Sequence, residues 1–429
     1  MIVKENGLKF AKLIHVSVDN GKTGQSNKVY IMEEQSDGKI KCEYGRVGKR
    51  LTTVYKQSYE WNKIYKNKTS NSKGYKDVTD MVSEKITDNT GTNKSKTADI
   101  SCVKVRNLFD ELMSFANKAI QKNYKVTQDT VTQKQIDSAQ DILNDAVKSV
   151  KIGMDVNKLN ELLISLYSII PREMKDVRDY LINTSDVKNN LDKVNDFLSN
   201  EQDTLDTMAG QVRLLKQQRD SVNTKIGEDK GDEITLLEQM GLKVSVEEDE
   251  ERLKLIYKLL GKNKKQAKKI FKCINERTQA DFDENFNKAR VKKNRLYWHG
   301  SRNENWFNII QTGLMIRPSG AIHTGSMFGD GIYFANKAQK SIGYSSLRGS
   351  YWTNGGSNKG YLALFDVHVG NQKHIKTHDS SCYKLSKKVM DNEGYDSVYA
   401  HGGVDLRNDE FIIYNGKQCT IAYLIEIQN

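Results

Sequence analysis

The spacing of apolar residues changes twice along this 429-residue chain, and these changes constrain its fold more than any other feature. From about residue 105 to 241, apolar residues recur every three or four positions, which is typical of amphipathic helices. The regions before and after contain short runs of β-branched and aromatic residues, which are typical of strands. A chain of this length also exceeds what one hydrophobic core usually serves. We therefore expect a multidomain α+β protein.

Composition sets the predicted domain boundaries. Residues 83–104 contain no aromatic side chain and are rich in Thr, Ser, Asn, Lys and Asp, so we expect a flexible linker there. The predicted domains are then a small β-rich domain at 1–82, an all-α bundle at 105–241 and an α+β domain at 242–429. Formal charges are +6 for residues 1–90, −3 for 91–241 and +9 for 242–429. The two basic parts favour polyanionic partners, although solvated lysine-rich surfaces are an equal alternative from charge alone.

Three segments of the last domain combine strand-like runs with chemically active side chains. They are Leu-Tyr-Trp-His-Gly-Ser with His299, Gly-Ile-Tyr-Phe-Ala with Tyr333, and Asp-Glu-Phe-Ile-Ile with Glu410. Taken singly, His299 fits a hydrogen-bonded turn residue, Tyr333 a core residue and Glu410 a surface charge on an edge strand. No GxGxxG run follows a strand and opens a helix, which argues against a Rossmann mode of dinucleotide binding. A split antiparallel sheet with a cleft fits the order of strands better.

Together, these three segments resemble the donor site of the poly(ADP-ribose) polymerases, enzymes that cleave NAD and transfer its ADP-ribose to an acceptor. The resemblance makes the last domain an ADP-ribosyltransferase domain with Glu410, His299 and Tyr333 as catalytic residues. A fixed carboxylate can hold the ribose 2′-hydroxyl, stabilise the positive charge that develops on the ribose, and activate an acceptor hydroxyl. NAD is then the substrate, and no metal is expected.

The resemblance also implies the residues that contact NAD. His299 would bind the ribose on the adenosine side and Ser301 would lie beside the adenosine, while Tyr333 and Tyr344 would stack on the nicotinamide ring. Further contacts are implied for Gly300, Ala335, Lys340 and Ser341. Met327 matches a position that contacts an acceptor ADP-ribose unit.

The N-terminal region contains an aromatic residue, a glycine and an arginine in succession, Tyr44-Gly45-Arg46, at the end of a predicted hairpin. We expect its strands at Lys28–Met32 and Ile40–Tyr44, with a turn at Ser36–Lys39. An exposed ring can stack on a terminal base or sugar, and an arginine fork can hold a phosphate. The alternative is a hairpin whose tyrosine and arginine only pack on each other.

This region resembles a WGR domain, the nucleic-acid-sensing module of DNA-dependent poly(ADP-ribose) polymerases, with Tyr44 where the family has tryptophan. The resemblance implies nucleic-acid contacts for Asn27, Tyr44, Arg46 and Tyr75, and damaged or nicked DNA as a partner. Because tyrosine has a smaller ring than tryptophan, we expect weaker stacking here.

The middle region contains five apolar stripes with helical spacing, which predict a packed α-helical bundle. Thr132 and Gln135 have the spacing of an N-terminal capping box, and Pro171 stops the third stripe. The run Leu166–Arg172 resembles part of the helical regulatory domain of these polymerases. That resemblance implies that the bundle obstructs NAD entry until DNA binding loosens it. The stripes comprise Leu108–Ala119, Ile136–Val150, Leu159–Ile170, Val187–Leu198 and Val212–Val222.

Cysteine usage and hydropathy bear on location. None of the five cysteines forms a CxxC pair, no apolar run reaches about 18 residues, and no apolar segment near the start precedes a cleavage site. We expect reduced thiols in an intracellular protein, nuclear in a eukaryote and cytoplasmic or nucleoid-associated in a bacterium. We expect no membrane partner and a monomer in solution.

The leading functional hypothesis is a DNA-activated polymerase of ADP-ribose that modifies proteins, including itself, and holds its growing poly(ADP-ribose) product, in the response to DNA damage. A mono-ADP-ribosyltransferase that modifies a protein or a nucleic-acid end once is the first alternative. A catalytically silent DNA-binding scaffold is the second. The scaffold hypothesis predicts salt-dependent DNA binding without nicotinamide release.

Overall fold

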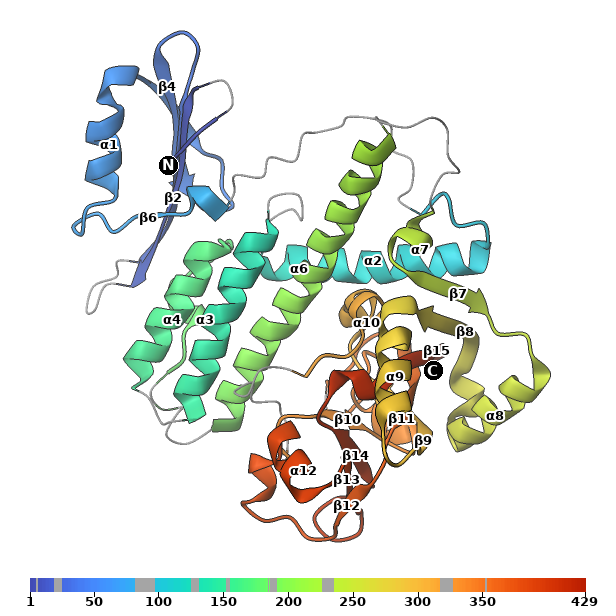
Figure 1. The fold of residues 1–429 in the computed structure, drawn as a ribbon. Coiled ribbons are helices and arrows are strands. Elements are labelled where there is room, and N and C mark those ends of the chain that lie inside the picture. Colours follow the sequence, from blue (N-terminus) through green and yellow to red (C-terminus); the bar gives the residue numbers. More distant parts are fainter. Residues whose placement is uncertain are drawn as a thin grey trace. The chain divides into compact units, whose positions relative to one another are not determined.

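The computed structural model describes residues 1–4, 7–18, 25–81, 97–124, 131–151, 155–183, 185, 191–225, 235–316, 327–351 and 353–429. These residues divide into two compact units, whose elements are drawn in Figure 1. The first unit consists mainly of Met1–Gly91 and Lys118–Val212, and the second of Thr92–Asn117, Arg213–Ser319 and Gly325–Asn429. Residues 82–96, most of the predicted linker, lie outside the described part of the chain.

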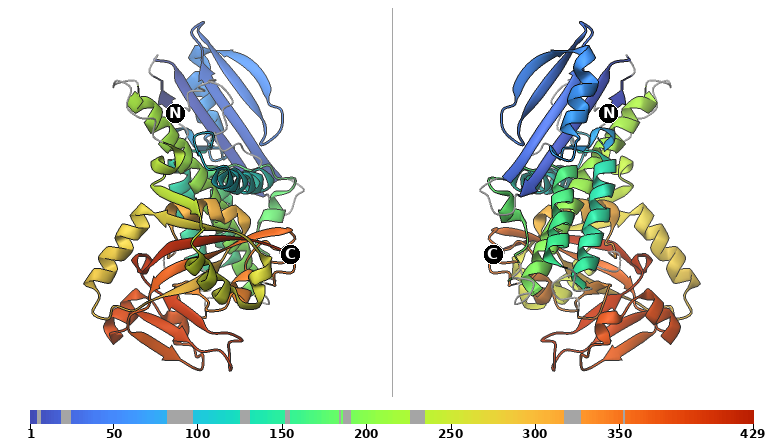
Figure 2. Two further views of the ribbon diagram at one scale, coloured as in Figure 1. Left: turned by 90° about the vertical axis from the view of Figure 1, so that its right-hand side faces the viewer. Right: turned by 90° about the vertical axis from the view of Figure 1, so that its left-hand side faces the viewer.

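The first unit opens with an antiparallel sheet, whose long strands are seen in Figure 2. The predicted hairpin is confirmed, because Tyr30 pairs with Tyr44 and Glu34 with Ile40 across the turn. Helix α1 (Trp61–Lys68) contributes Trp61, which is buried against Leu13 and Met32 of the sheet. The strands, in the order β1-β2-β3-β4-β5 with β6 beside β2, are β1 (Ile2–Val3), β2 (Lys9–Val18), β3 (Gln25–Glu34), β4 (Lys39–Arg46), β5 (Thr52–Gln57) and β6 (Lys76–Asp77).

Helices α3 (Gln133–Lys151) and α4 (Val156–Ile169) follow, together with α6 (Leu191–Lys225) as far as Val212. The predicted capping box is confirmed: Gln135 N donates to Thr132 Oγ1 at 3.2 Å, and Thr132 N donates to Gln135 Oε1 at 3.0 Å. Helix α4 ends at Ile169, two residues before Pro171. Parts of the last two predicted stripes, including Val187, lie outside the described residues or side chains.

The predicted stripes Ile136–Val150 and Leu159–Ile170 form one core with a face of the sheet. Leu143, Leu163 and Leu166 are buried in the same cluster as Ile14 and Val29. The end of α4 is fixed by a buried ion pair, because Arg172 and Glu201 are 3% and 7% exposed and Arg172 Nη1 lies 3.1 Å from Glu201 Oε1. This pair joins the chain after α4 to α6.

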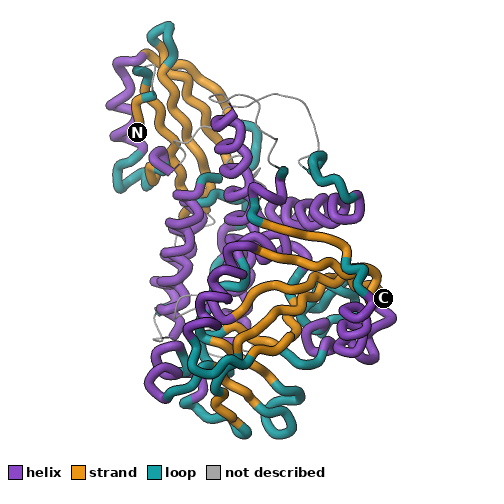
Figure 3. Tube along the Cα trace, turned by 45° about the vertical axis from the view of Figure 1, so that its right-hand side comes forward, coloured by secondary structure: helices purple, strands orange, loops and turns teal. Residues whose placement is uncertain are grey.

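The second unit is built on two sheets, shown in orange in Figure 3. The five-stranded sheet is antiparallel and has the order β7-β8-β15-β11-β9, with β7 (Leu242–Val246), β8 (Ala267–Asn275), β9 (Asn294–Gly300), β11 (Lys359–His368) and β15 (Cys419–Gln428). The four-stranded sheet has the order β10-β14-β13-β12, with β10 (Ile332–Phe334), β12 (Gln372–Ile375), β13 (Ser397–Ala400) and β14 (Glu410–Ile413). Strands β12 and β13 are parallel, so the sheets are not wholly antiparallel. The helices are α7 (Leu236–Gln239), α8 (Glu250–Leu260), α9 (Glu276–Lys288), α10 (Trp306–Thr312), α11 (Ala338–Ile342) and α12 (Lys387–Glu393).

One secondary-structure prediction for this unit is wrong. The lysine-rich stretch 262–269 follows a helical pattern and predicts a further helix, but Gly261–Gln266 forms a 3₁₀ turn and β8 begins at Ala267. Gly261 has a φ of +57°, a conformation that ends helix α8. The alternating burial of Phe271 and Cys273 against β7 and β15 then stabilises a strand, because tertiary packing overrides the helix propensity of lysine.

Helix α2 (Val103–Tyr124) supplies part of the core of the second unit through its residues up to Asn117. Phe109 and Leu112 are fully buried there with Phe271 and Tyr361. Glu111 of the same helix accepts hydrogen bonds from Tyr361 Oη at 2.7 Å and Lys359 Nζ at 2.8 Å. The first half of α2 is therefore fastened to strand β11 by both apolar and charged contacts.

None of the helices in the ranges given above has the length and hydropathy that crossing a membrane requires.

Candidate active site

Three neighbouring strands bring the predicted catalytic residues together. Strand β9 ends with His299 and Gly300, and its Trp298 exchanges backbone hydrogen bonds with Ala335 at 2.8 and 3.0 Å. Ala335 directly follows β10, which carries Tyr333. Strand β14 begins at Glu410 and pairs with β10. The site therefore lies where the two sheets of the second unit meet.

Glu410 is a buried carboxylate with one oxygen occupied and the other available. The residue is 7% exposed, and its Oε1 forms an ion pair with Lys340 Nζ from α11. Its Oε2 is buried and has no hydrogen-bond partner among the described residues. Because leaving a buried carboxylate oxygen unpaired is costly, such an atom is a candidate for binding a hydroxyl group of a ligand.

His299 is held as a neutral imidazole with a defined tautomer. Its Nδ1 lies 3.1 Å from the carbonyl oxygen of Tyr333. A carbonyl only accepts hydrogen bonds, so Nδ1 carries the proton and Nε2 presents a lone pair. Burial lowers the pKa of His299 below its ordinary value of 6.5, which keeps the ring uncharged at neutral pH. His299 Nε2 is therefore suited to accept a hydrogen bond from a ribose hydroxyl.

The two tyrosines of the predicted site remain protonated. Tyr333 Oη donates to Gly329 O at 2.8 Å and accepts from Phe328 N at 3.0 Å, which fixes its ring. Burial raises the pKa of Tyr333, and the charge of Glu410 raises it further. The same two causes raise the pKa of Tyr344 to about 12. Both phenols therefore lie within the electrostatic reach of the Glu410 carboxylate.

Gly300 allows β9 and α11 to approach each other closely. A Cβ atom at this position would lie 1.9 Å from the backbone oxygen of Ser341, which is 3% exposed. The neighbouring Ser301 accepts a hydrogen bond at its Oγ from Asn305 Nδ2 at 3.1 Å. A backbone cradle that only glycine fits is a common feature where a chain must approach a ligand or another segment.

Sequence reasoning missed a set of polar residues that hold the segment leading to Glu410. Asp409 accepts hydrogen bonds from Asn336 Nδ2 at 3.0 Å, Tyr399 Oη at 3.1 Å and Gly402 N at 2.9 Å. Asn336 directly follows Ala335, so the bond ties the end of β10 to the start of β14. The direct adjacency of Asn336 and Asp409 to two predicted site residues was the only signal in the sequence.

Met327, the predicted acceptor contact, lies at the edge of the described residues. Its carbonyl oxygen accepts a hydrogen bond from His378 Nε2 at 2.8 Å. In the described part of this unit, as in the other, no three His, Cys, Asp or Glu side chains are grouped so as to hold a metal ion.

The predicted nucleic-acid contacts of the first unit fall into two groups. Tyr44 is 37% exposed and stacks on Tyr30 with a centroid distance of 5.6 Å, and Tyr75 meets Tyr30 edge-on at 6.4 Å. Arg46 Nη2 donates to the carbonyl oxygens of Met174 and Lys175 at 3.0 and 2.7 Å. Asn27 is 1% exposed and donates to Arg172 O at 2.8 Å.

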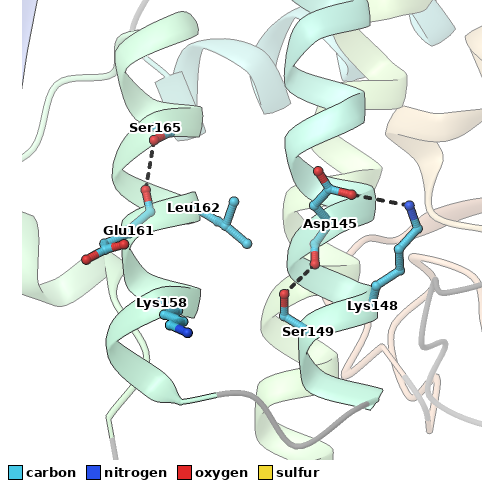
Figure 4. Close-up of a pocket in the computed structure, with 7 residues that line it drawn as sticks. All are labelled: Asp145, Lys148, Ser149, Lys158, Glu161, Leu162 and Ser165. Carbon is cyan, nitrogen blue, oxygen red and sulfur yellow. Dashed lines mark hydrogen bonds and ion pairs between the residues drawn. The ribbon is translucent and has the colours of Figure 1, made fainter.

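A cavity of about 560 Å³ lies between α3 and α4 of the first unit (Figure 4). The hydrogen bonds drawn there stay within one helix, such as Ser149 Oγ to Asp145 O at 2.6 Å and Ser165 Oγ to Glu161 O at 2.9 Å. No predicted site residue lines it. We assign no ligand to this cavity.

Known proteins resemble the second unit. Residues 250–429 match the poly(ADP-ribose) polymerase catalytic domain. The poly [ADP-ribose] polymerase-like protein 100L of Invertebrate iridescent virus 6 is 33% identical over 184 residues, which are 42% of this chain and 96% of that protein. Human poly [ADP-ribose] polymerase 2 is 30% identical over 161 residues, covering 31% of this chain and 26% of that protein. The mouse protein mono-ADP-ribosyltransferase PARP3 is 29% identical over 172 residues, covering 32% and 30% respectively.

The fold and site of the second unit are those of an enzyme that transfers ADP-ribose from NAD. The chain belongs to the poly(ADP-ribose) polymerase family. It matches nearly the whole of the viral relative but only about a quarter of the human one.

Proposed function

We propose that this enzyme is activated by DNA breaks and builds poly(ADP-ribose) on protein acceptors, itself included, in the response to DNA damage. The observation that carries the catalytic part is the buried carboxylate of Glu410, which has Lys340 on one oxygen and no described partner on the other. The other two predicted catalytic residues, His299 and Tyr333, lie on the adjoining strands β9 and β10.

The described residues offer groups that are suited to hold NAD. Glu410 Oε2 and His299 Nε2 are two acceptors for ribose hydroxyls, and Tyr333 and Tyr344 supply neutral rings for the nicotinamide. NAD supplies the ADP-ribosyl group: the bond from ribose C1 to the nicotinamide nitrogen breaks as a bond from C1 to an acceptor oxygen forms.

Glu410 has two tasks in this reaction. Its negative charge stabilises the cationic ribose at the transition state, and its carboxylate takes the proton of the attacking acceptor hydroxyl before releasing it to solvent. Lys340 fixes the position of the carboxylate through Oε1 and leaves Oε2 for the ribose. The neutral His299 orients the other ribose without adding a positive charge that would oppose the developing cation.

Activation by DNA is supported by the first unit. Tyr44 presents part of its ring to solvent on a platform of stacked tyrosines, and the region 1–90 carries a formal charge of +6. Arg46, the predicted phosphate contact, is bonded to the carbonyls of residues 174 and 175. A phosphate that recruits Arg46 would compete with these carbonyls, so DNA binding and the packing of the helices would be linked.

This competition is also our proposal for regulation. The segment after α4 is held by Arg46 and Asn27 on one side and by the buried Arg172–Glu201 pair on the other. Loosening the first set of contacts would change the stability of the helices that we propose act as a brake on the catalytic unit.

The direct test measures nicotinamide release from labelled NAD with nicked, blunt-ended and intact DNA. We expect release to rise with nicked DNA; equal turnover with and without every DNA would refute DNA activation. The Glu410→Gln variant should still bind NAD but form no polymer, and Glu251→Gln, at a side chain 83% exposed, is the matched control. Unchanged chain lengths with Glu410→Gln would contradict its assigned role.

A second variant tests the DNA contact alone. Tyr44→Ala should weaken binding of nicked DNA by about tenfold, the loss of one stacked base, while basal turnover stays the same. Tyr59→Ala is the control, because Tyr59 is 84% exposed in the same unit and has no predicted role. Equal DNA affinities of the two variants would remove Tyr44 from the binding surface.

Transfer of a single ADP-ribose is the second candidate function, favoured by the similarity to the mouse mono-ADP-ribosyltransferase. The size of the labelled product on a denaturing gel decides between them. A ladder supports the polymerase, and one discrete band supports the mono-transferase.

A further inference from the structure

The most basic stretch of the chain lies in the catalytic unit, outside the site described above. Between Arg252 and Asn275 the sequence has nine basic residues and no acidic residue. Basic stretches are commonly solvated surface, so the sequence alone assigns no role to this one. The position of the stretch in the fold and the exposure of its lysines indicate a role.

The stretch covers the back of the helix that carries the catalytic ion pair. Helix α8 and the 3₁₀ turn Gly261–Gln266 both contact α11. Ile256 and Leu260 of α8 are buried with Ala338 and Ile342 of α11, while Lys340 on the same short helix faces Glu410. One helix is about 10–12 Å wide with its side chains. The basic stretch therefore lies about that far from the catalytic carboxylate.

The lysines on the outer side of this stretch are exposed and uncompensated. Lys258, Lys262, Lys264 and Lys265 are exposed, and none of them has an ion pair within the described chain. Lys268 is also exposed, and its only described hydrogen bond is to the carbonyl of Lys265 at 3.4 Å. The acidic residues before the stretch, 247–251, lie at the start of α8, about 16 Å from the turn, and the next acidic residue after it is Glu276 at the start of α9.

Exposed aromatic and basic side chains extend this surface. Tyr257 is 40% exposed on α8, directly before Lys258. The turn is joined to Arg348 through Asn429, whose side chain accepts from Gln266 Nε2 at 3.1 Å and donates to Arg348 O at 2.9 Å. Tyr351, three residues after Arg348, is 76% exposed. Lysines together with exposed rings are suited to bind a flexible polyanion that carries bases.

We propose that this surface, the α8 lysine surface (Lys258, Lys262, Lys264, Lys265 and Lys268, with Tyr257), binds the poly(ADP-ribose) that the enzyme makes and holds the growing chain beside the site. The inference rests on the proposed polymerase function. Each added unit brings two phosphates for the lysines and an adenine for an exposed ring. A chain held within about one helix width of Glu410 leaves the site slowly, so more units are added per binding event.

The observations favour this product over DNA as the occupant. The lysines border the helix of the active site, in the unit that carries the catalytic residues. The tyrosine platform that we propose binds DNA belongs to the first unit. The surface is dominated by lysines, which attract phosphates as point charges without reading base edges in a duplex.

The test uses the full-length protein and purified free poly(ADP-ribose), so it does not depend on the protein's own polymer synthesis. The variant Lys262→Gln/Lys264→Gln/Lys265→Gln removes three charges from the surface. Lys288→Gln/Arg290→Gln/Lys292→Gln removes three exposed charges, one at the end of α9 and two between α9 and β9, and is the control. Affinity is measured by fluorescence polarisation at several salt concentrations, and the chain lengths of the product are compared on gels.

We expect the surface variant alone to bind the polymer more weakly, with a salt dependence (the slope of log affinity against log salt) reduced by about 2. Its product chains should be shorter, while attachment of the first unit proceeds at the wild-type rate. Tyr257→Ser should weaken binding by about tenfold.

Unchanged affinity in the surface variant, or an equal loss in the control, would overturn the inference. A preference for DNA at this surface would also overturn the inference. The wild type would then bind single-stranded DNA more tightly than poly(ADP-ribose) with the same number of phosphates, and the surface variant would lose this preference. An enzyme that attaches only one unit yet binds free polymer at this surface would refute the polymerase proposal and leave the binding site in place.

Discussion

Replacing Gly300 by alanine is the most direct test of how the site is assembled. The added Cβ would lie 1.9 Å from Ser341 O, whereas ordinary contacts begin at 3.4 Å, so β9 and α11 must separate by about 1.5 Å. Both partners are backbone, so no flexible side chain can move aside. The shift would carry His299 away from the Lys340–Glu410 pair. A misplacement of about 1 Å can cost about 100-fold in rate, so we expect kcat/KM to fall at least about that much, or about 2.7 kcal/mol.

The assay is nicotinamide release at varied NAD concentration, with thermal unfolding measured on the same samples. Overpacking should also lower the stability by about 1–3 kcal/mol. Gly356→Ala is the matched control, because a Cβ there meets no atom within 4 Å. If Gly300→Ala keeps kcat/KM within about threefold of the wild type, the close contact of β9 and α11 is not what positions the catalytic groups.

Three further predictions concern stability, each measured by urea unfolding. Glu201→Gln should cost about 3 kcal/mol because Arg172 stays buried and charged, and Arg172→Met with Glu201→Leu should recover most of it; equal losses would contradict this. Leu163→Ala, at a fully buried position, should cost about 2–5 kcal/mol, and a loss below about 1 kcal/mol would contradict the described core. Burial lowers the folded pKa of His299, so the unfolded state binds more protons and stability falls as pH drops below 6.5. His299→Asn should flatten that decline.

The parts of the fold that sequence reasoning predicted are those encoded locally. The hairpin of β3 and β4 forms where the sequence predicts it, and the capping box of α3 forms as its spacing indicates. The predicted catalytic residues meet because each lies on a strand whose apolar run is easy to recognise. In such segments, local propensity and burial agree.

The parts that could not be predicted depend on partners far away in the chain. Arg46 was expected to hold a phosphate, but its described partners are carbonyls 128 and 129 residues later. The contact between Asn336 and Asp409 spans 73 residues, and the strand beginning at Ala267 forms only because β7 and β15 flank it. Local patterns do not specify such pairings.

The anchoring of α2 has a practical consequence for anyone who dissects this protein. A truncation that begins at Leu242, the predicted start of the catalytic domain, would remove Phe109 and Leu112 from the core and leave the amine of Lys359 and the phenol of Tyr361 without Glu111. Low activity of that fragment would then report an opened core and say nothing about whether a brake had been lifted. A fragment intended to test whether removing the helices raises activity should keep the first half of α2, joined by a short linker to residue 235.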